Sequence, residues 1–237
     1  MQQRDIEYRD SAGQAYAGHY AAPDAPRGAG VLLAHNAPSL GDFERRTAAR
    51  LADLGYSVFC ADYLGADGID GAAGREALGA LFADTRLTRD RAAAALAVLT
   101  SQPGVDTRRI AALGYCFGGT VALELARAGA DLRGVVGLHA GLPLSHPDDN
   151  RAIRAKLLLI EGSADPLVPA EMRAGFERQM DQAGVDWQLH LLGGVPHGFS
   201  VPGIDKMGRA GIAYDRRADE RSWKLLVGFL AETTAPL

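Results

Sequence analysis

The sequence is poor in cysteine, in long apolar runs and in an excess of charge of either sign. Its two cysteines, Cys60 and Cys116, are too few for a disulfide framework or an unaided metal site, so each is expected to be a reduced thiol. The 25 lysines and arginines stand against 29 aspartates and glutamates, a net charge of -4. Because no basic stripe is present, neither nucleic acid nor an anionic membrane is expected as a partner.

The chain also lacks an apparent targeting or membrane segment. Charged residues are spread through positions 1–20, and nowhere does the sequence approach the ~20 consecutive apolar residues of a membrane span. This predicts a cytoplasmic protein. With 47% hydrophobic and 23% charged residues, the chain is expected to form one globular domain over residues 1–237.

Short apolar segments alternate with stretches of helical periodicity along the chain. Continuous apolar runs of this length are typical of strands buried on both faces. The alternation predicts an α/β fold, with a mostly parallel, doubly wound sheet covered by helices on both faces and preceded by a hairpin that turns at 11–13. The expected strands are 30–35, 56–62, 109–115, 133–140, 155–162 and 187–192, and the expected helices are 41–54, 74–81, 88–100, 118–130, 170–183 and 221–232.

Cys116 lies where an expected strand meets an expected helix, in the stretch "LGYCFGG". Glycines at 114, 118 and 119 permit the tight strand-to-helix turn known as a nucleophile elbow, which exposes its central side chain above the sheet. A helix N-terminus also favours the thiolate, the nucleophilic form of cysteine. An isolated cysteine is more often buried and structural, but the flanking glycines favour a catalytic role here.

A catalytic acid and a histidine are expected after the nucleophile in this architecture. Asp165 follows the strand 155–162 in "EGSADPLVP", and His197 follows the strand 187–192 in "GGVPHGF". Taken singly, each is as readily a turn or loop residue. Their order after the appropriate strands predicts that His197 acts as the base and Asp165 orients it.

An oxyanion hole and substrate contacts complete the expected site. The hole requires the N–H of the residue after the nucleophile and one from the loop after the strand 30–35, which are those of Phe117 and Ala37. We assign contact with the substrate to Asn36, Arg75 and Phe199. The long aperiodic segments 63–73 and 200–217 are expected beside the site, because loops at the carboxyl ends of parallel strands bind ligands.

Together these motifs resemble the dienelactone hydrolase family, α/β-hydrolases with a Cys-Asp-His triad. The resemblance runs from "GAGVLLAHNAPSLGDFERRTAARLADLGYSVFCADYLG" through "LGYCFGG", "GSADPLVP" and "VPHGFS". It implies a cytoplasmic hydrolase of small esters or lactones that needs no cofactor or metal, with Cys116, Asp165 and His197 as the triad.

The sequence departs from the family pattern at two places. Family enzymes have a glutamate at the end of the third strand, where this chain has Asn36. They also hold a substrate carboxylate with two arginines. Arg75 is similar to one of them, but "GFSVPG" offers no match for the other, and Arg209 is the nearest candidate.

The predicted function is hydrolysis of a small ester or lactone through a thioester on Cys116, by a monomer or a homodimer. Two alternatives stay open on the same fold. A Cys-dependent acyl transferase or thioesterase would use the same triad with a different acceptor or substrate. A ligand-binding or redox-sensing protein would use an exposed cysteine without turnover.

Overall fold

The structure, a computed structural model, describes residues 1–37, 39–65, 72–143 and 147–236. Within this part of the chain, eight strands form one sheet in the spatial order β1-β2-β4-β3-β5-β6-β7-β8. The neighbours from β4 to β8 pair in parallel, and only β2 pairs antiparallel, with β1 and with β4. The strands are β1 (Gln2–Arg9), β2 (Ala15–Ala22), β3 (Gly28–Ala34), β4 (Ser57–Ala61), β5 (Val105–Tyr115), β6 (Gly134–Leu138), β7 (Lys156–Gly162) and β8 (Trp187–Leu192).

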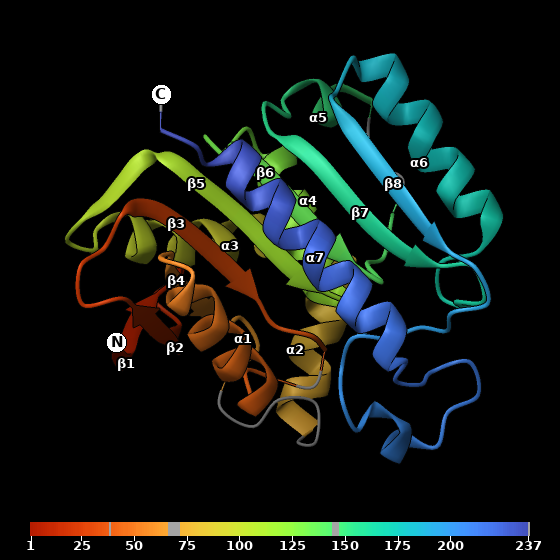
Figure 1. Cartoon of the computed structure of the whole chain (residues 1–237), viewed down its shortest axis with the longest axis horizontal. Coiled ribbons are helices and arrows are strands. Elements are labelled where there is room, and N and C mark those ends of the chain that lie inside the picture. Colours follow the sequence, from red (N-terminus) through yellow and green to blue (C-terminus); the bar gives the residue numbers. More distant parts are fainter. Residues whose placement is uncertain (38, 66–71, 144–146, 237) are drawn as a thin grey trace.

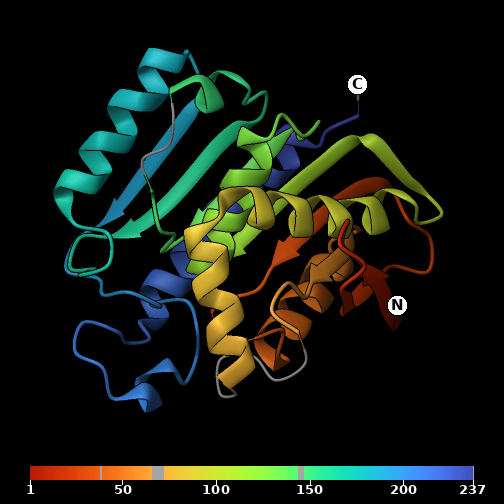
Figure 2. The ribbon, with the colours of Figure 1, turned by 180° about the vertical axis from the view of Figure 1, so that it is seen from behind.

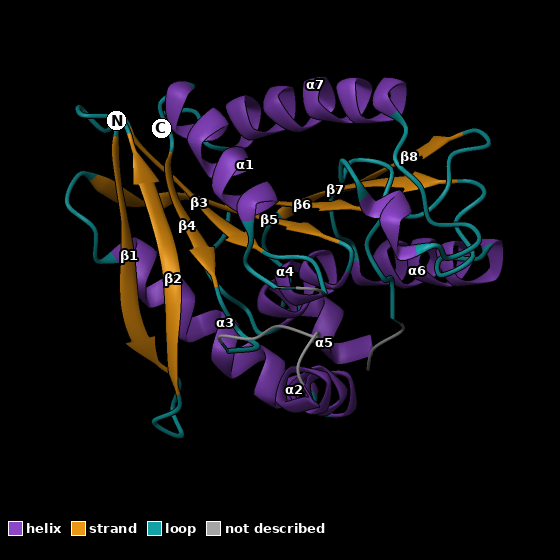
Figure 3. Cartoon of the chain, turned by 90° about the horizontal axis from the view of Figure 1, so that it is seen from below, coloured by secondary structure: helices purple, strands orange, loops and turns teal. Residues whose placement is uncertain are grey.

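Helices cover both faces of the sheet, as predicted. Figures 1 and 3 show α1 and α7 on one face, whereas α2 to α6 lie on the other, which Figure 2 shows from behind. In the described residues, no helix is both long and apolar enough to cross a membrane. The helices are α1 (Asp42–Asp53), α2 (Ala72–Ala83), α3 (Thr85–Thr100), α4 (Phe117–Arg127), α5 (Pro147–Arg151), α6 (Ala170–Ala183), α7 (Arg216–Thr233) and the short 3₁₀ helix η2 (Ile204–Met207).

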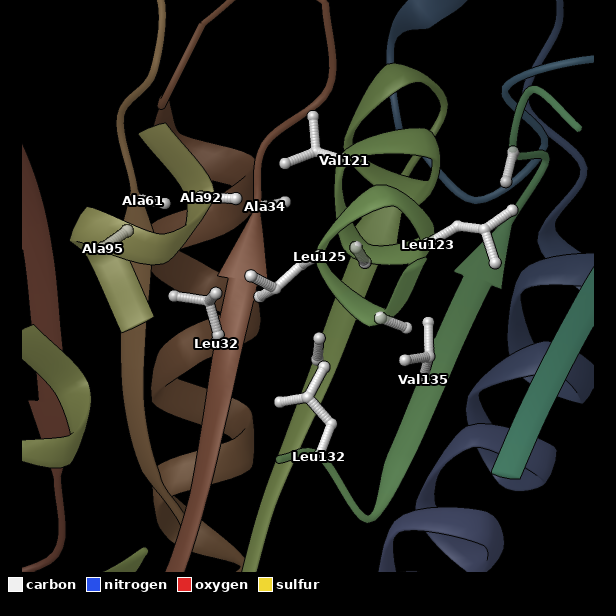
Figure 4. Packing of buried hydrophobic residues seen from close by; sticks show 14 of the residues in the cluster. Leu32, Ala34, Ala61, Ala92, Ala95, Val121, Leu123, Leu125, Leu132 and Val135 are labelled. Atoms are coloured by element: carbon white, nitrogen blue, oxygen red, sulfur yellow. The ribbon is translucent and has the colours of Figure 1, made fainter. Parts of the chain in front are cut away.

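Each central strand contributes side chains to two hydrophobic cores, because successive side chains point to opposite faces of the sheet. In β3, Leu32 and Ala34 pack under α3 and α4 (Figure 4), whereas Val31 and Leu33 pack on the side of α1 and α7. All four are at most 2% exposed. The continuous apolar runs in the sequence thus correspond to strands buried on both faces.

Most expected elements are present with shifted ends. The hairpin and the six later strands are confirmed, and α6 has the predicted bounds. Helix α7 begins five residues before its expected start, at Arg216, because Asp215 caps it by accepting a hydrogen bond from the Ala218 N–H. The short elements α5 and η2 were not predicted, and 66–71 of the expected loop 63–73 lie outside the described residues.

Candidate active site

Cys116 occupies a sharp turn between β5 and α4. Its φ of +53° lies in the left-handed region, which residues other than glycine rarely adopt. The helix follows so closely that a Cβ on Gly114 would lie 2.0 Å from the Gly118 carbonyl oxygen, and one on Gly118 would lie 2.3 Å from that of Ala34. These glycines therefore allow the backbone contacts that hold Cys116 at the carboxyl edge of the sheet.

A chain of hydrogen bonds links the three residues predicted as a triad. The Cys116 Sγ lies 3.1 Å from His197 Nε2, and His197 Nδ1 lies 2.7 Å from Asp165 Oδ2. The other Asp165 oxygen accepts the Leu167 N–H at 2.7 Å, which fixes the carboxylate. Asp165 and His197 are buried, whereas the cysteine side chain is partly exposed. The structure thus brings together residues that are up to 81 positions apart.

The surroundings of His197 favour its protonated form. Burial alone would lower its pKa, but the hydrogen bonds to Asp165 and Cys116 outweigh burial and raise the pKa to about 10. The ring therefore carries a positive charge at neutral pH.

Behind His197 lies a second buried histidine, His139, in a strained backbone conformation with φ of +39°. Its ring packs edge-on against His197, with centroids 5.1 Å apart, and its Nε2 lies 2.8 Å from Ser200 Oγ. Burial, followed by the charge of His197, lowers its pKa well below the usual range, so the ring is neutral.

Glu161 is a buried acid that the sequence analysis missed. One carboxyl oxygen accepts the Ala140 N–H at 2.9 Å, and the other has no hydrogen-bond partner in the described structure. Burial raises its pKa well above the usual range. The sequence does contain a signal for this buried acid, because a glutamate interrupts the apolar run "KLLLIEG".

The proposed oxyanion residues lie on the same cavity as the sulfur. Phe117 is the first residue of α4, so its N–H is one of those that a helix leaves without an intrahelical acceptor. Ala37 follows β3, and both residues line the cavity together with Cys116.

Asn36 also lines the cavity, and an unexpected glutamate holds its backbone. Glu44 of α1 accepts the Asn36 N–H at 3.3 Å and the Gly41 N–H at 3.0 Å. The Asn36 side-chain oxygen is buried without a hydrogen-bond partner in the described residues. Glu44 lies eight residues after Asn36 in the sequence, so the motif at the end of the strand did not predict their contact.

The structure places the other two predicted substrate contacts away from the cavity wall. Phe199 is completely buried and does not line the cavity, because its ring packs edge-on against His139 in the core on the α7 side. Arg75 is exposed on α2 and is also absent from the cavity wall, although Leu78, one turn later, lines it. Arg209 contributes to the wall instead.

The cavity itself has a volume of about 500 Å³, a size typical of small-molecule sites. Helices α2, α3 and α4 form one wall, and the segments after β7 and β8 form the other. Figures 1 and 2 show α2 and η2 at the same end of the molecule. The second aperiodic segment, 200–217, thus lies at the site as predicted.

Comparisons with known proteins identify the family of this chain. A crystal structure of a dienelactone hydrolase-like promiscuous phosphotriesterase from metagenomic libraries is 36% identical, with a TM-score of 0.93 over 98% of both chains. A probable 2-oxo-3-(5-oxofuran-2-ylidene)propanoate lactonase of Bradyrhizobium is 31% identical over 115 residues, 45% of this chain and 46% of that protein. An uncharacterized protein of Caenorhabditis elegans is 32% identical over 154 residues, 62% of this chain and 94% of that protein. The profile of the dienelactone hydrolase family matches residues 16–234, and the chain belongs to this family of α/β-hydrolases.

Proposed function

We propose that the protein hydrolyses small carboxylic esters or lactones through a thioester on Cys116. The observation that carries this proposal is the hydrogen-bond chain from Cys116 through His197 to Asp165, at the wall of a cavity of substrate size. Membership of a hydrolase family and similarity to a probable lactonase support it.

In the first half of the reaction, the sulfur attacks the carbonyl carbon and forms a C–S bond. The carbonyl electron pair moves onto oxygen, where the N–H groups of Phe117 and Ala37 stabilise it, each by about 3 kcal/mol. The C=O bond re-forms as the C–O bond to the alcohol breaks. The leaving alkoxide takes the proton from His197 Nε2, which points at the sulfur.

In the second half, the neutral His197 removes a proton from water, and the hydroxide adds to the thioester carbonyl. Collapse breaks the C–S bond and returns the thiolate beside a protonated ring. Asp165 keeps Nδ1 protonated throughout, so that Nε2 exchanges the proton. With a lactone, the alcohol stays attached to the acyl group, and water must therefore add before the ring closes again.

Hydrolysis of uncharged phosphotriesters is a second candidate function. A relative 36% identical over nearly the whole chain is described as a promiscuous phosphotriesterase, and the cavity wall here is largely apolar. The cytoplasmic location and the monomeric or homodimeric state remain predictions from the sequence.

The test is turnover of p-nitrophenyl acetate and of a p-nitrophenyl dialkyl phosphate by the wild type and by Cys116→Ala. We expect the variant to lose at least a thousandfold in ester hydrolysis, with acylated Cys116 detectable by mass spectrometry in the wild type. Equal slow rates in both proteins would overturn the proposal and favour binding or redox sensing.

A further inference from the structure

The mouth of the cavity is unusually apolar. Six large hydrophobic side chains are strongly exposed in the described part of the chain, and three of them line this cavity. Phe82, Leu167 and Met207, here called the apolar rim, are 64%, 52% and 43% exposed. They come from α2, the β7–α6 loop and η2, elements far apart in sequence. Exposed apolar groups gathered around one opening indicate a binding surface.

The apolar surface continues inward from the rim. Leu81 and Leu142 are buried in the wall, and Val201, Ile204 and Ile212 line the opposite side. An apolar chain entering past the rim would therefore lose water along its whole length, the condition under which hydrophobic binding is strongest.

The charged groups on the wall do not alter this character. Glu124 lies at one end of the cavity, where Arg127 binds one of its oxygens at 2.7 Å and Arg89 binds the other at 2.9 Å. Arg89 also donates to Asp149 at 2.6 Å, so two arginines and two carboxylates offset one another within the protein. Arg209 is exposed, so water screens its charge.

Among the described wall residues, Arg209 is also the sole lysine or arginine. The one buried cation on this wall, the His197 ring, is already paired with Asp165 and Cys116. A substrate carboxylate taken into the interior would therefore leave water without an unpaired buried cation to receive it, which is costly. The wall is therefore suited to an uncharged molecule.

We infer that the preferred substrate is an uncharged ester with an apolar chain of several carbons, which fills the cavity and is covered at its outer end by the apolar rim. This inference rests on the proposed ester hydrolysis and specifies its substrate class. Each methylene group that leaves water is worth about fourfold in kcat/KM, so chain length amplifies the effect.

The first experiment compares p-nitrophenyl acetate with p-nitrophenyl octanoate. We expect the wild type to prefer octanoate by at least about tenfold in kcat/KM. The triple variant Phe82→Ser, Leu167→Ser and Met207→Ser should reduce this preference by about tenfold, mainly through KM. Leu54→Ser and Leu191→Ser are matched controls, because these leucines are 46% and 49% exposed but lie away from the cavity, and both variants should retain the preference.

The second experiment tests charge with the mono-p-nitrophenyl ester of octanedioic acid, which has the same length and a terminal carboxylate. We expect it to react at least about tenfold more slowly than octanoate. Faster hydrolysis of the charged ester, lost in Arg209→Gln, would overturn the inference and identify an anion site.

The variant Cys116→Ala distinguishes failure of the proposed ester hydrolysis from failure of the inferred substrate class. Undiminished turnover of acetate by this variant would refute the proposed function itself. An inactive variant, together with a wild type that is indifferent to chain length, would refute only the substrate class.

Discussion

The two cysteines of this protein differ in backbone setting and therefore in chemistry. Cys60 lies within the regular strand β4, is completely buried, and donates a weak hydrogen bond to the Glu44 carbonyl oxygen at 3.7 Å. Burial, followed by the nearby Glu44 charge, raises its pKa well above the usual range. Cys116 lies one residue past β5, is partly exposed, and contacts the His197 ring.

The contrast shows that the turn, rather than the residue type, determines whether a cysteine is exposed. A strand directs its side chains into the layers above and below the sheet, so Cys60 meets only packed protein. The left-handed φ at Cys116 breaks this alternation and turns the side chain to the sheet edge, where loops supply a histidine.

The largest expected difference is in alkylation of the native protein. Iodoacetamide should modify Cys116 at least about a thousandfold faster than Cys60, because reaction at the buried thiol requires opening of the fold. Peptide mapping by mass spectrometry measures both rates in one sample. In urea the two rates should converge, and comparable native rates would contradict the assignment of Cys60 to the core.

The next prediction concerns His197, the hydrogen-bond partner of the Cys116 sulfur. His197→Ala should slow acylation at least about a hundredfold, measured as the initial release of p-nitrophenolate. The matched control is His190→Ala, because that ring lies on β8 with only a 3.5 Å contact to Gln188. A near-normal rate in His197→Ala would remove this residue from the mechanism.

A smaller effect is expected in the pH dependence of stability. Since the pKa of His197 is raised to about 10 in the fold, its protonation stabilises the native state fully below the unfolded pKa of about 6.5. This stabilisation is lost as the pH rises from there through 10. Compared with His197→Gln, the wild type should lose unfolding free energy over this range. Parallel urea-unfolding profiles for the two proteins would contradict the charged ring.

The site residues that the sequence could predict are those that lie at the ends of strands. Chain order and strand ends were sufficient to bring Cys116, Asp165 and His197 together, because parallel strands end at one edge. Chain order and strand ends were insufficient to place Phe199, which lies two residues after His197. The segment there is aperiodic, so no pattern indicates whether a side chain lines the cavity or lies in the core. The same holds for Arg75, because its helix position determines whether it faces the cavity and the pattern of α2 is only weakly amphipathic.

Contacts between residues of different helices, strands and loops could not be predicted from the order of residues in the sequence. Glu44 reaches from α1 to the loop after β3, and the apolar rim combines three segments spread over residues 82–207. Such sets are defined by distances that only the packed fold specifies. Motifs predicted the groups proposed for the chemistry, whereas the surface inferred to select the substrate became visible only in the structure.

The smallest predicted effect is that of Cys60→Ala. Removing the buried sulfur leaves a small cavity and a weak hydrogen bond unmade, which should cost about 1 kcal/mol of unfolding free energy. The kcat/KM should stay within about twofold, although Cys60 contacts the backbone of Glu44, whose carboxylate holds the Asn36 N–H. Urea unfolding and ester turnover measure the two quantities. A tenfold loss of activity at unchanged stability would mean that β4 positions the oxyanion loop through α1, and the two cysteines would then belong to one site.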